Sequence, residues 1–205
     1  MIISCSFFKG NIHIPNAEDT APNSNLIGNV TNIVLFIEEY ERDVLLECLG
    51  YSLFQEFVNE LDSSSSNGLK TTAHQKWNDL LNGKDYQING KPVKWRGLIF
   101  KDGQLERSLI ANYVFCEFLN RDLISYKSVG TQKEKSKNSV HVSADPLYVA
   151  SFRKFYKLTE FSNNCNGGNG LKSFYDFIQD MNNETPGTYA NWQPKRFENV
   201  NILGI

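Results

Sequence analysis

The chain has 205 residues, 40% of them hydrophobic and 21% charged, which is enough apolar material for a core in one domain with or without extensions. The formal net charge of -2 excludes a protein that grips nucleic acid through its whole surface, because such proteins are strongly basic. No apolar run approaches the length of a membrane span, and the start, MIISCSFFKG, lacks the features of a signal peptide. Cys48 and Cys116 fall on apolar helix patterns, so we expect free thiols in a reducing compartment.

Residues 1–30 are rich in asparagine and are predicted to be an N-terminal lead-in that opens with a short strand, Ile2 to Phe8. An amphipathic helix then begins, capped by Thr31 or Asn32, and ends at Gly50. Its apolar positions recur at three-to-four spacing, and acidic residues fill the other face. The acidic residues are Glu38, Glu39, Glu41, Asp43 and Glu47. Such a face is weak as a metal site and is more typical of a solvated or subunit-facing surface.

Two shorter helices are predicted to follow. The first runs from Tyr51 to Leu61 and ends in a flexible serine-rich loop, Asp62 to Gly68. The second runs from Thr71 to Leu81, and its inner face carries Trp77 and Leu80.

The segment Asp85 to Leu98 is predicted to be a β-hairpin. Asn89-Gly90 suits the two positive-φ positions of a type I′ turn, and Pro92 makes the second arm an edge strand or a short arm. The next helix, Gln104 to Tyr126, is apolar on nearly all sides. A helix of this kind is buried by several neighbours, which can include other subunits.

The stretch Lys127 to Ser143 is polar and lacks apolar periodicity, so we expect a mobile arm. Its basic residues are Lys127, Lys133, Lys135 and Lys137. These lysines either reach the phosphates of a nucleic acid or belong to a solvated loop. We predict that the arm lies at a channel or against an adjacent subunit.

Two last helices are predicted, from Pro146 to Phe161 and from Leu171 to Met181. The glycine-rich run Gly167 to Ser173 looks like a P-loop, but a leucine separates its last glycine from its lysine and no apolar strand precedes it. The chain has no HExxH, CxxC or GxGxxG signature, and its histidines lie far apart. We therefore expect no enzyme activity, no metal and no cofactor.

The segment Asn183 to Ile205 is predicted to be a C-terminal docking tail that follows a helical domain of residues 31–182. Its prolines prevent a helix, yet its apolar content is too high for a disordered tail. The candidate docking residues are Tyr189, Trp192, Phe197, Val200, Ile202, Leu203 and Ile205. They either complete the chain's own core or dock on another protein. We favour docking, because the helices already supply enough apolar surface.

Three runs, in this order, carry a resemblance: FIEEYERDVLLECLGYSLFQEF, KWNDLLNGKDYQINGKPVKWRGL and LIANYVFCEFLNRDLISYKSVGTQ. Together they resemble the head–tail connector (adaptor) proteins of tailed phages, and most of all those of Bacteroidetes phages and prophages, including crAss-like phages. The resemblance covers roughly residues 30 to 132.

The helix patterns and the single Asn-Gly turn predict a mainly α fold: a helical bundle with a small β-hairpin and extended N- and C-terminal segments. The resemblance likewise implies a small, mainly helical protein. It also implies a non-enzymatic virion protein that assembles in the host cytoplasm as a homo-oligomeric ring, typically of about twelve copies. The ring would bind beneath the portal protein, extend the channel for passing double-stranded DNA and present a surface to neck or tail proteins. The alternative is a small soluble helical binding or regulatory protein of a phage or prophage, without a ring role.

Overall fold

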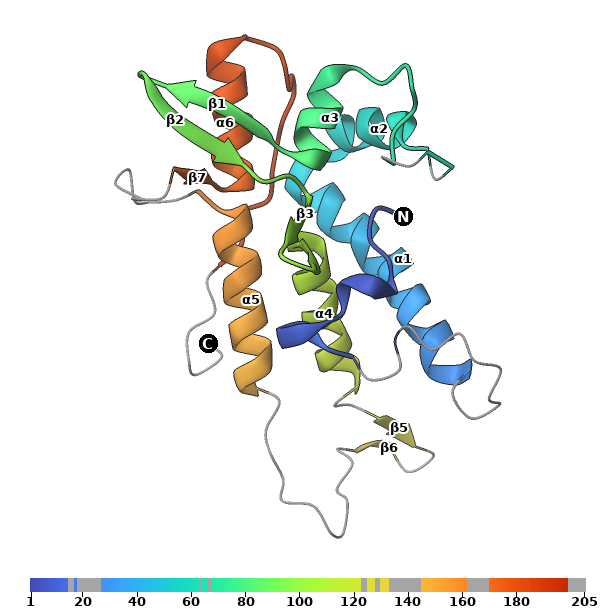
Figure 1. Ribbon diagram of the computed structural model, residues 1–205. Helices are drawn as coiled ribbons and strands as arrows, with labels where there is room; N and C mark the ends of the chain where they lie inside the picture. Colours follow the sequence, from blue (N-terminus) through green and yellow to red (C-terminus); the bar gives the residue numbers. More distant parts are fainter. Residues whose placement is uncertain are drawn as a thin grey trace.

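The computed structural model describes residues 1–14, 17, 27–62, 64, 65, 68–122, 125–127, 130–132, 145–161 and 170–198. These residues are mainly helical, with small sheets (Figure 1). The α-helices are α1 (Ile27–Leu49), α2 (Tyr51–Glu60), α3 (Gln75–Asn82), α4 (Leu109–Asp122), α5 (Asp145–Thr159) and α6 (Phe174–Glu184). The strands are β1 (Lys84–Ile88), β2 (Lys91–Trp95), β3 (Ile99–Asp102), β4 (Leu105–Ser108), β5 (Ser125–Lys127), β6 (Gly130–Gln132) and β7 (Leu171–Lys172). The mainly α prediction is confirmed, although the sheets make the fold more mixed than a pure bundle.

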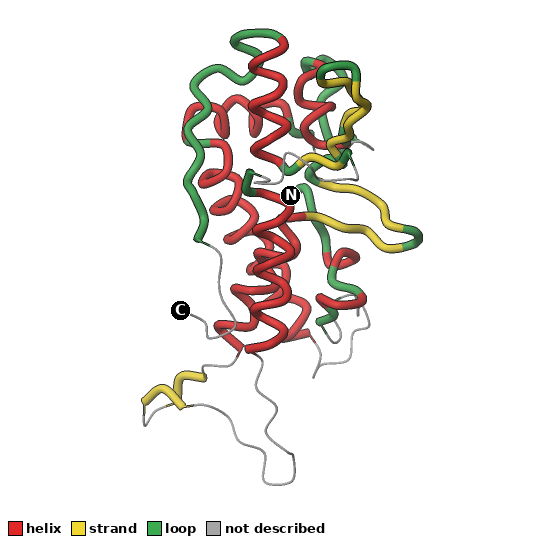
Figure 2. The backbone as a smooth tube through the Cα atoms, turned by 90° about the vertical axis from the view of Figure 1, so that its left-hand side faces the viewer, coloured by secondary structure: helices red, strands yellow, loops and turns green. Residues whose placement is uncertain are grey.

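The helix α4 forms the centre of the body and packs against both α1 and α5 (Figure 1). Its residues Ile110, Val114 and Phe115 are buried in the shared core. The apolar residues on most sides of α4 are thus buried largely by other parts of the same chain. Seen from the side, the long helices run lengthwise, and the β3–β4 hairpin projects from the body at about mid-height (Figure 2). None of the helices within the described residues is long and apolar enough to span a bilayer.

The predicted hairpin is present as β1 and β2, with Asn89 at φ 50° and Gly90 at φ 75° in the turn. The strand β2 is the middle strand of a three-stranded sheet, because β7 pairs with it in parallel. That pairing involves Lys94 and Trp95 and so begins beyond Pro92, which has no backbone N–H to donate. Trp95 is buried against α6.

Residues 105–108 were expected to be helical but form β4, which pairs with β3 in a second hairpin. Gly103 turns this hairpin with φ 64°, and α4 begins only after Ser108. The Ser108 hydroxyl accepts the Ile110 N–H at 3.0 Å, which satisfies one free donor at the helix start. The helix also ends earlier than predicted, at Asp122, and residues 125–127 belong to β5.

The predicted strand Ile2 to Phe8 is wrong, because the chain makes two short 3-10 turns there, Cys5–Phe7 and Gly10–Ile12. The carboxylate of Glu41 on α1 accepts the N–H groups of Ile2 and Ile3 at 2.8–2.9 Å. In a strand these backbone N–H groups would donate hydrogen bonds to a neighbouring strand, but here they donate to the buried side chain of Glu41.

The end of α3 and the link from β2 to β3 touch at Gly83 and Gly97. Their φ angles are 95° and 98°. A Cβ atom on Gly97 would lie 2.6 Å from the Leu81 carbonyl oxygen, and one on Gly83 would lie 2.6 Å from that of Trp95. Only glycine permits this backbone approach, which fixes the β2–β3 link against α3.

Candidate functional site

The predicted docking residues of the tail lie in the chain's own core wherever the structure describes them. Tyr189 is 1% exposed, and its hydroxyl donates to the Lys76 carbonyl oxygen at 2.7 Å. Trp192 lies against Phe161 and Tyr175, with ring centroids 6.2 and 5.3 Å away. The indole N–H of Trp192 donates to the carbonyl oxygen of Cys48 at 3.0 Å.

Phe197 completes this arrangement by packing edge-on to Phe155, at 4.9 Å between ring centroids. The prediction that the tail stays out of its own core is therefore wrong for Tyr189, Trp192 and Phe197. The helices leave a seam between α1, α5 and α6 that aromatic side chains of the tail fill. The other predicted docking residues, Val200, Ile202, Leu203 and Ile205, lie outside the described residues.

Residues 186–198, here named the C-terminal strap, are also fixed by backbone and charged contacts. The Lys195 N–H donates to the Glu47 carbonyl oxygen at 2.7 Å, and the Lys195 ammonium pairs with the Glu47 carboxylate at 2.6 Å. Buried Glu160 accepts the Phe197 N–H at 2.6 Å and pairs with Arg196 at 3.0 Å. The strap thus ties the end of α1 to the end of α5.

The predicted lysine arm is described only at its beginning. Lys127 is the last residue of β5, which pairs with β6 in a short hairpin. In Figure 1 this hairpin lies beyond the lower end of α4, far from the sheet of β1, β2 and β7. Lys133, Lys135 and Lys137 lie outside the described residues.

The acidic residues of α1 divide into three kinds of environment. Glu38, Glu39 and Asp43 are exposed, and Glu39 pairs with Arg121 of α4 at 3.2 Å. Glu41 is buried against the N-terminal segment, and Glu47 pairs with the strap. No group of three or more metal-ligating side chains occurs within the part of the chain that the structure describes.

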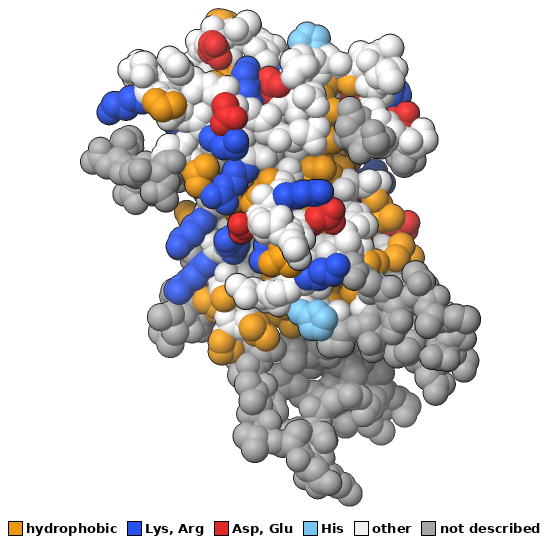
Figure 3. All heavy atoms as spheres, viewed as in Figure 1, with side chains coloured by type: hydrophobic (Ala, Val, Ile, Leu, Met, Phe, Trp, Pro, Cys, Tyr) orange, Lys and Arg blue, Asp and Glu red, His pale blue; other side chains and the backbone are white. Residues whose placement is uncertain are grey.

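A groove of about 420 Å³ opens between α5, the β2–β3 link and the β7–α6 junction. We name it the basic groove. Its cations are Arg96, Lys154, Lys157 and Lys172, and its apolar residues are Trp95, Phe100, Leu109, Leu158 and Leu171. Figure 3 shows Lys and Arg side chains gathered in a band over α5 and the strands beside it.

The cations of the basic groove differ in how far they are already neutralised. Lys172 pairs with Asp180 at 3.1 Å, and the Arg96 guanidinium lies 5.3 Å from the centre of the Phe100 ring. Lys154 and Lys157 are exposed and form no ion pair with any described residue. Two positive charges at the rim are therefore available to an anionic partner.

Sequence reasoning missed this groove. Its cations come from the β2–β3 link, α5 and β7, so no local run of basic residues marks it. The lysines at 154 and 157 are one helical turn apart, which was the single local signal.

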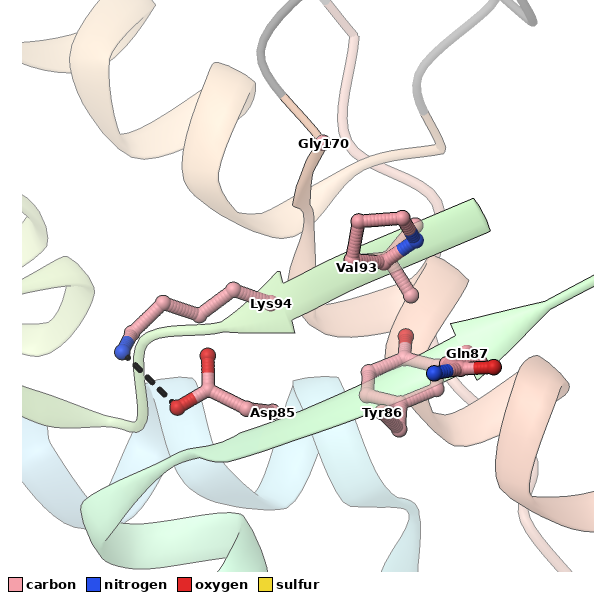
Figure 4. Close-up of a pocket in the computed structure, with 7 residues that line it drawn as sticks. Asp85, Tyr86, Gln87, Val93, Lys94 and Gly170 are labelled. Atoms are coloured by element: carbon pink, nitrogen blue, oxygen red, sulfur yellow. Dashed lines mark hydrogen bonds and ion pairs between the residues drawn. The ribbon is translucent and has the colours of Figure 1, made fainter. Parts of the chain in front are cut away.

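A second pocket, of about 330 Å³, lies on the β1–β2 hairpin beside Gly170 (Figure 4). Its charged groups already satisfy each other, because Lys94 pairs with Asp85 at 3.1 Å. The Tyr86 hydroxyl donates to Asp180 at 2.9 Å, and burial together with this carboxylate raises the Tyr86 pKa. This pocket therefore offers less unsatisfied charge than the basic groove.

The buried thiols offer little chemistry. Cys48 and Cys116 are both free and buried, as the sequence predicts. Burial raises the pKa of the Cys116 thiol to about 12, so the reactive thiolate is scarce at neutral pH.

Comparison with models of protein families, with curated proteins and with solved structures finds no match to this chain.

Proposed function

We propose that this chain is a head–tail connector (adaptor) subunit of a tailed phage. Copies join in a ring beneath the portal protein, extend the DNA channel and present a surface to neck or tail proteins. The observation that carries the proposal is the order of elements. An acidic helix, two short helices, the β1–β2 hairpin and a largely buried helix occur in the order that the resemblance implies, with the β3–β4 hairpin before the last of them.

The position of the β5–β6 hairpin supports a role in assembly. It lies beyond the end of the helical body, where it is available to a neighbouring molecule (Figure 1). The lysine-rich stretch of residues 133–137 follows it directly in the sequence. We propose that these lysines face the channel or the adjacent subunit, where they meet passing DNA through its phosphates without reading its sequence.

Portal docking is assigned to the last apolar residues alone, because the strap is committed to its own core. These residues are Val200, Ile202, Leu203 and Ile205. Removal of residues 199–205 then abolishes portal binding but leaves the strap in place. A truncated protein with an unchanged thermal midpoint that still binds the portal contradicts this assignment.

The proposal is tested first by searching the genes beside this chain's own gene for one that encodes a portal protein, and then by co-expressing the two proteins. Native mass spectrometry and electron microscopy of the purified complex should show a ring of this chain on one end of the portal. A chain that stays monomeric beside an assembled portal contradicts the proposal.

A small soluble binding protein is the second candidate function, and the basic groove favours it. A cationic rim around an apolar floor suits an acidic peptide with an apolar side chain. The two functions differ in the portal experiment, because a monomeric binding protein forms no ring.

A further inference from the structure

The outer surface of α1 combines negative charge with one protruding apolar side chain. Leu35 is 54% exposed, and Glu38, Glu39 and Asp43 are exposed around it. Residues three and four positions apart share one side of a helix, so Leu35 stands beside both glutamates. We name these four residues the acidic face. The only basic residue exposed on the described side chains of α1 is Arg42.

The basic groove has the complementary character. Its rim carries the exposed ammonium groups of Lys154 and Lys157, which pair with no carboxylate among the described residues, while half-buried Leu158 contributes apolar surface. Leu171 at the edge is 39% exposed. An apolar side chain flanked by carboxylates is therefore complementary to the basic groove, because the apolar group meets apolar surface and the carboxylates meet the lysines.

The two surfaces cannot meet within one molecule. The acidic face is exposed on α1, where Glu39 pairs with Arg121 of α4. The groove is built on α5, and α4 packs against both α1 and α5 (Figure 1). Two different surfaces that fit each other form a heterologous contact between copies. Repetition of such a contact gives a closed ring or an open filament.

We propose that the acidic face of one copy seats in the basic groove of the next copy, with Leu35 entering between Lys154 and Lys157. This inference rests on the proposed function, in which copies assemble as a ring. A second copy fits the groove better than DNA does, because the phosphate backbone carries no apolar side chain for the apolar floor.

Charge reversal with rescue tests the contact in the full chain assembled with its portal. Two double variants are compared: one reverses the groove, Lys154→Glu with Lys157→Glu, and the other reverses the acidic face, Glu38→Lys with Asp43→Lys. Each should lower the assembled fraction at least about tenfold. Mixing the two variant proteins should restore attraction at every contact of an alternating assembly, because the unchanged face of one meets the unchanged groove of the other and the two reversed surfaces also meet. Combining all four changes in one chain should likewise restore the ring.

Lys91→Glu with Lys101→Glu is the matched control, because both lysines are exposed and neither lines the groove. This variant changes the net charge equally and should assemble normally. Circular dichroism and the thermal midpoint of every variant establish that the fold is kept. Unchanged assembly of both reversal variants, or a four-change chain that does not assemble, overturns the inference.

Cross-linking of the unmodified protein gives a second test. A carbodiimide joins a carboxylate to an amine only in direct contact, and mixing ¹⁴N with ¹⁵N protein identifies links between copies. We expect mixed-isotope links from Lys154 or Lys157 to Glu38, Glu39 or Asp43. Links only at other positions overturn the inference.

The two proposals fail in different ways. A portal-bound ring with cross-links elsewhere contradicts the groove contact but leaves the connector role intact. The expected cross-links in copies that never bind a portal contradict the connector role but leave the contact intact. The groove could instead bind DNA. In that case the double variant Lys154→Glu with Lys157→Glu would bind duplex DNA more weakly but assemble normally, and this result would overturn the proposed contact between copies.

Discussion

Glu41 shows how one residue can hold a chain terminus. Glu41 is 6% exposed, and its carboxylate accepts two backbone N–H groups and lies 3.9 Å from the terminal amino group. Burial raises the pKa of this carboxyl, and the N–H bonds from Ile3 and Ile2 and the charged terminus oppose that rise. Loss of solvation is the larger effect, so the fold destabilises the ionised form of the Glu41 carboxyl relative to the protonated form.

The raised pKa of Glu41 predicts a pH dependence. The folded carboxyl binds its proton more tightly than the unfolded one, so its contribution to stability is full below the unfolded pKa and is lost as pH rises through the folded pKa. Between about pH 4 and pH 7, the free energy of unfolding of the wild type should fall relative to that of Glu41→Gln. Urea denaturation at several pH values measures this. A constant difference contradicts the prediction.

A comparison of Gly50 with Gly90 distinguishes the cost of a positive φ angle from the cost of a steric clash with the strap. Its φ is 78°, and a Cβ atom there would lie 2.7 Å from the Gln193 carbonyl oxygen of the strap. Gly90 has a similar φ of 75° but nothing within 4 Å of an added Cβ atom. Gly50→Ala should therefore cost more than Gly90→Ala, which costs about 1 kcal/mol for the φ angle alone. Equal shifts of the urea midpoint would show that the strap is not seated on this junction.

At the scale of elements, the strap replaces the docking tail that the sequence predicts. It has no regular structure, yet it buries Tyr189 and bonds Trp192 to the end of α1. Backbone groups of such a segment need partners, and Glu47, Glu160 and Asn182 provide several of them. The strap is therefore a structural element of the domain.

Truncation tests the strap with a control inside the same tail. A chain that ends at Thr185 loses the strap and should be destabilised by at least about 3–5 kcal/mol, the cost of deleting one large buried aromatic side chain. A chain that ends at Glu198 keeps the strap and should retain its thermal midpoint. Equal midpoints for the two truncated chains would contradict the role given to the strap.

Local patterns predicted the elements that depend on local physics. The turn at Asn89-Gly90 and the spans of α1, α2 and α5 follow from periodicity and turn chemistry, although α1 begins earlier than expected. The β3–β4 hairpin was missed because the turn at Asp102-Gly103 stands beside a strongly apolar helix, and the helix was predicted to begin at Gln104, so that it covered β4.

Long-range features could not be predicted in the same way. The apolar residues of the tail correctly indicated that it packs on something, but composition does not identify the surface. The strap meets α1 across the whole domain, as Lys195 and Glu47 show, and the cations of the basic groove meet only after folding. One sequence carries no signal for such pairs.

At the scale of the whole molecule, charge is separated although the net charge is near zero. Carboxylates are exposed on α1, and ammonium groups are exposed on α5. A net charge of -2 therefore hides two local fields of opposite sign.

Charge separation predicts that self-association depends on salt while folding does not. Raising the ionic strength from about 0.05 M to about 0.5 M screens exposed charges beyond a few ångströms, so the assembled fraction should fall. The thermal midpoint should change little, because the core is apolar. Sedimentation velocity and thermal unfolding in the same buffers measure both. Association that strengthens with salt would identify an apolar contact instead.

Both ends of the described chain close on α1: Ile2 and Ile3 on Glu41, and Lys195 on Glu47. During synthesis, α1 leaves the ribosome long before the strap does. The junction of α1 with α2 must therefore wait, with its apolar surface uncovered, until the strap has been synthesised. The last native contacts form between residues far apart in the chain, which slows the final step.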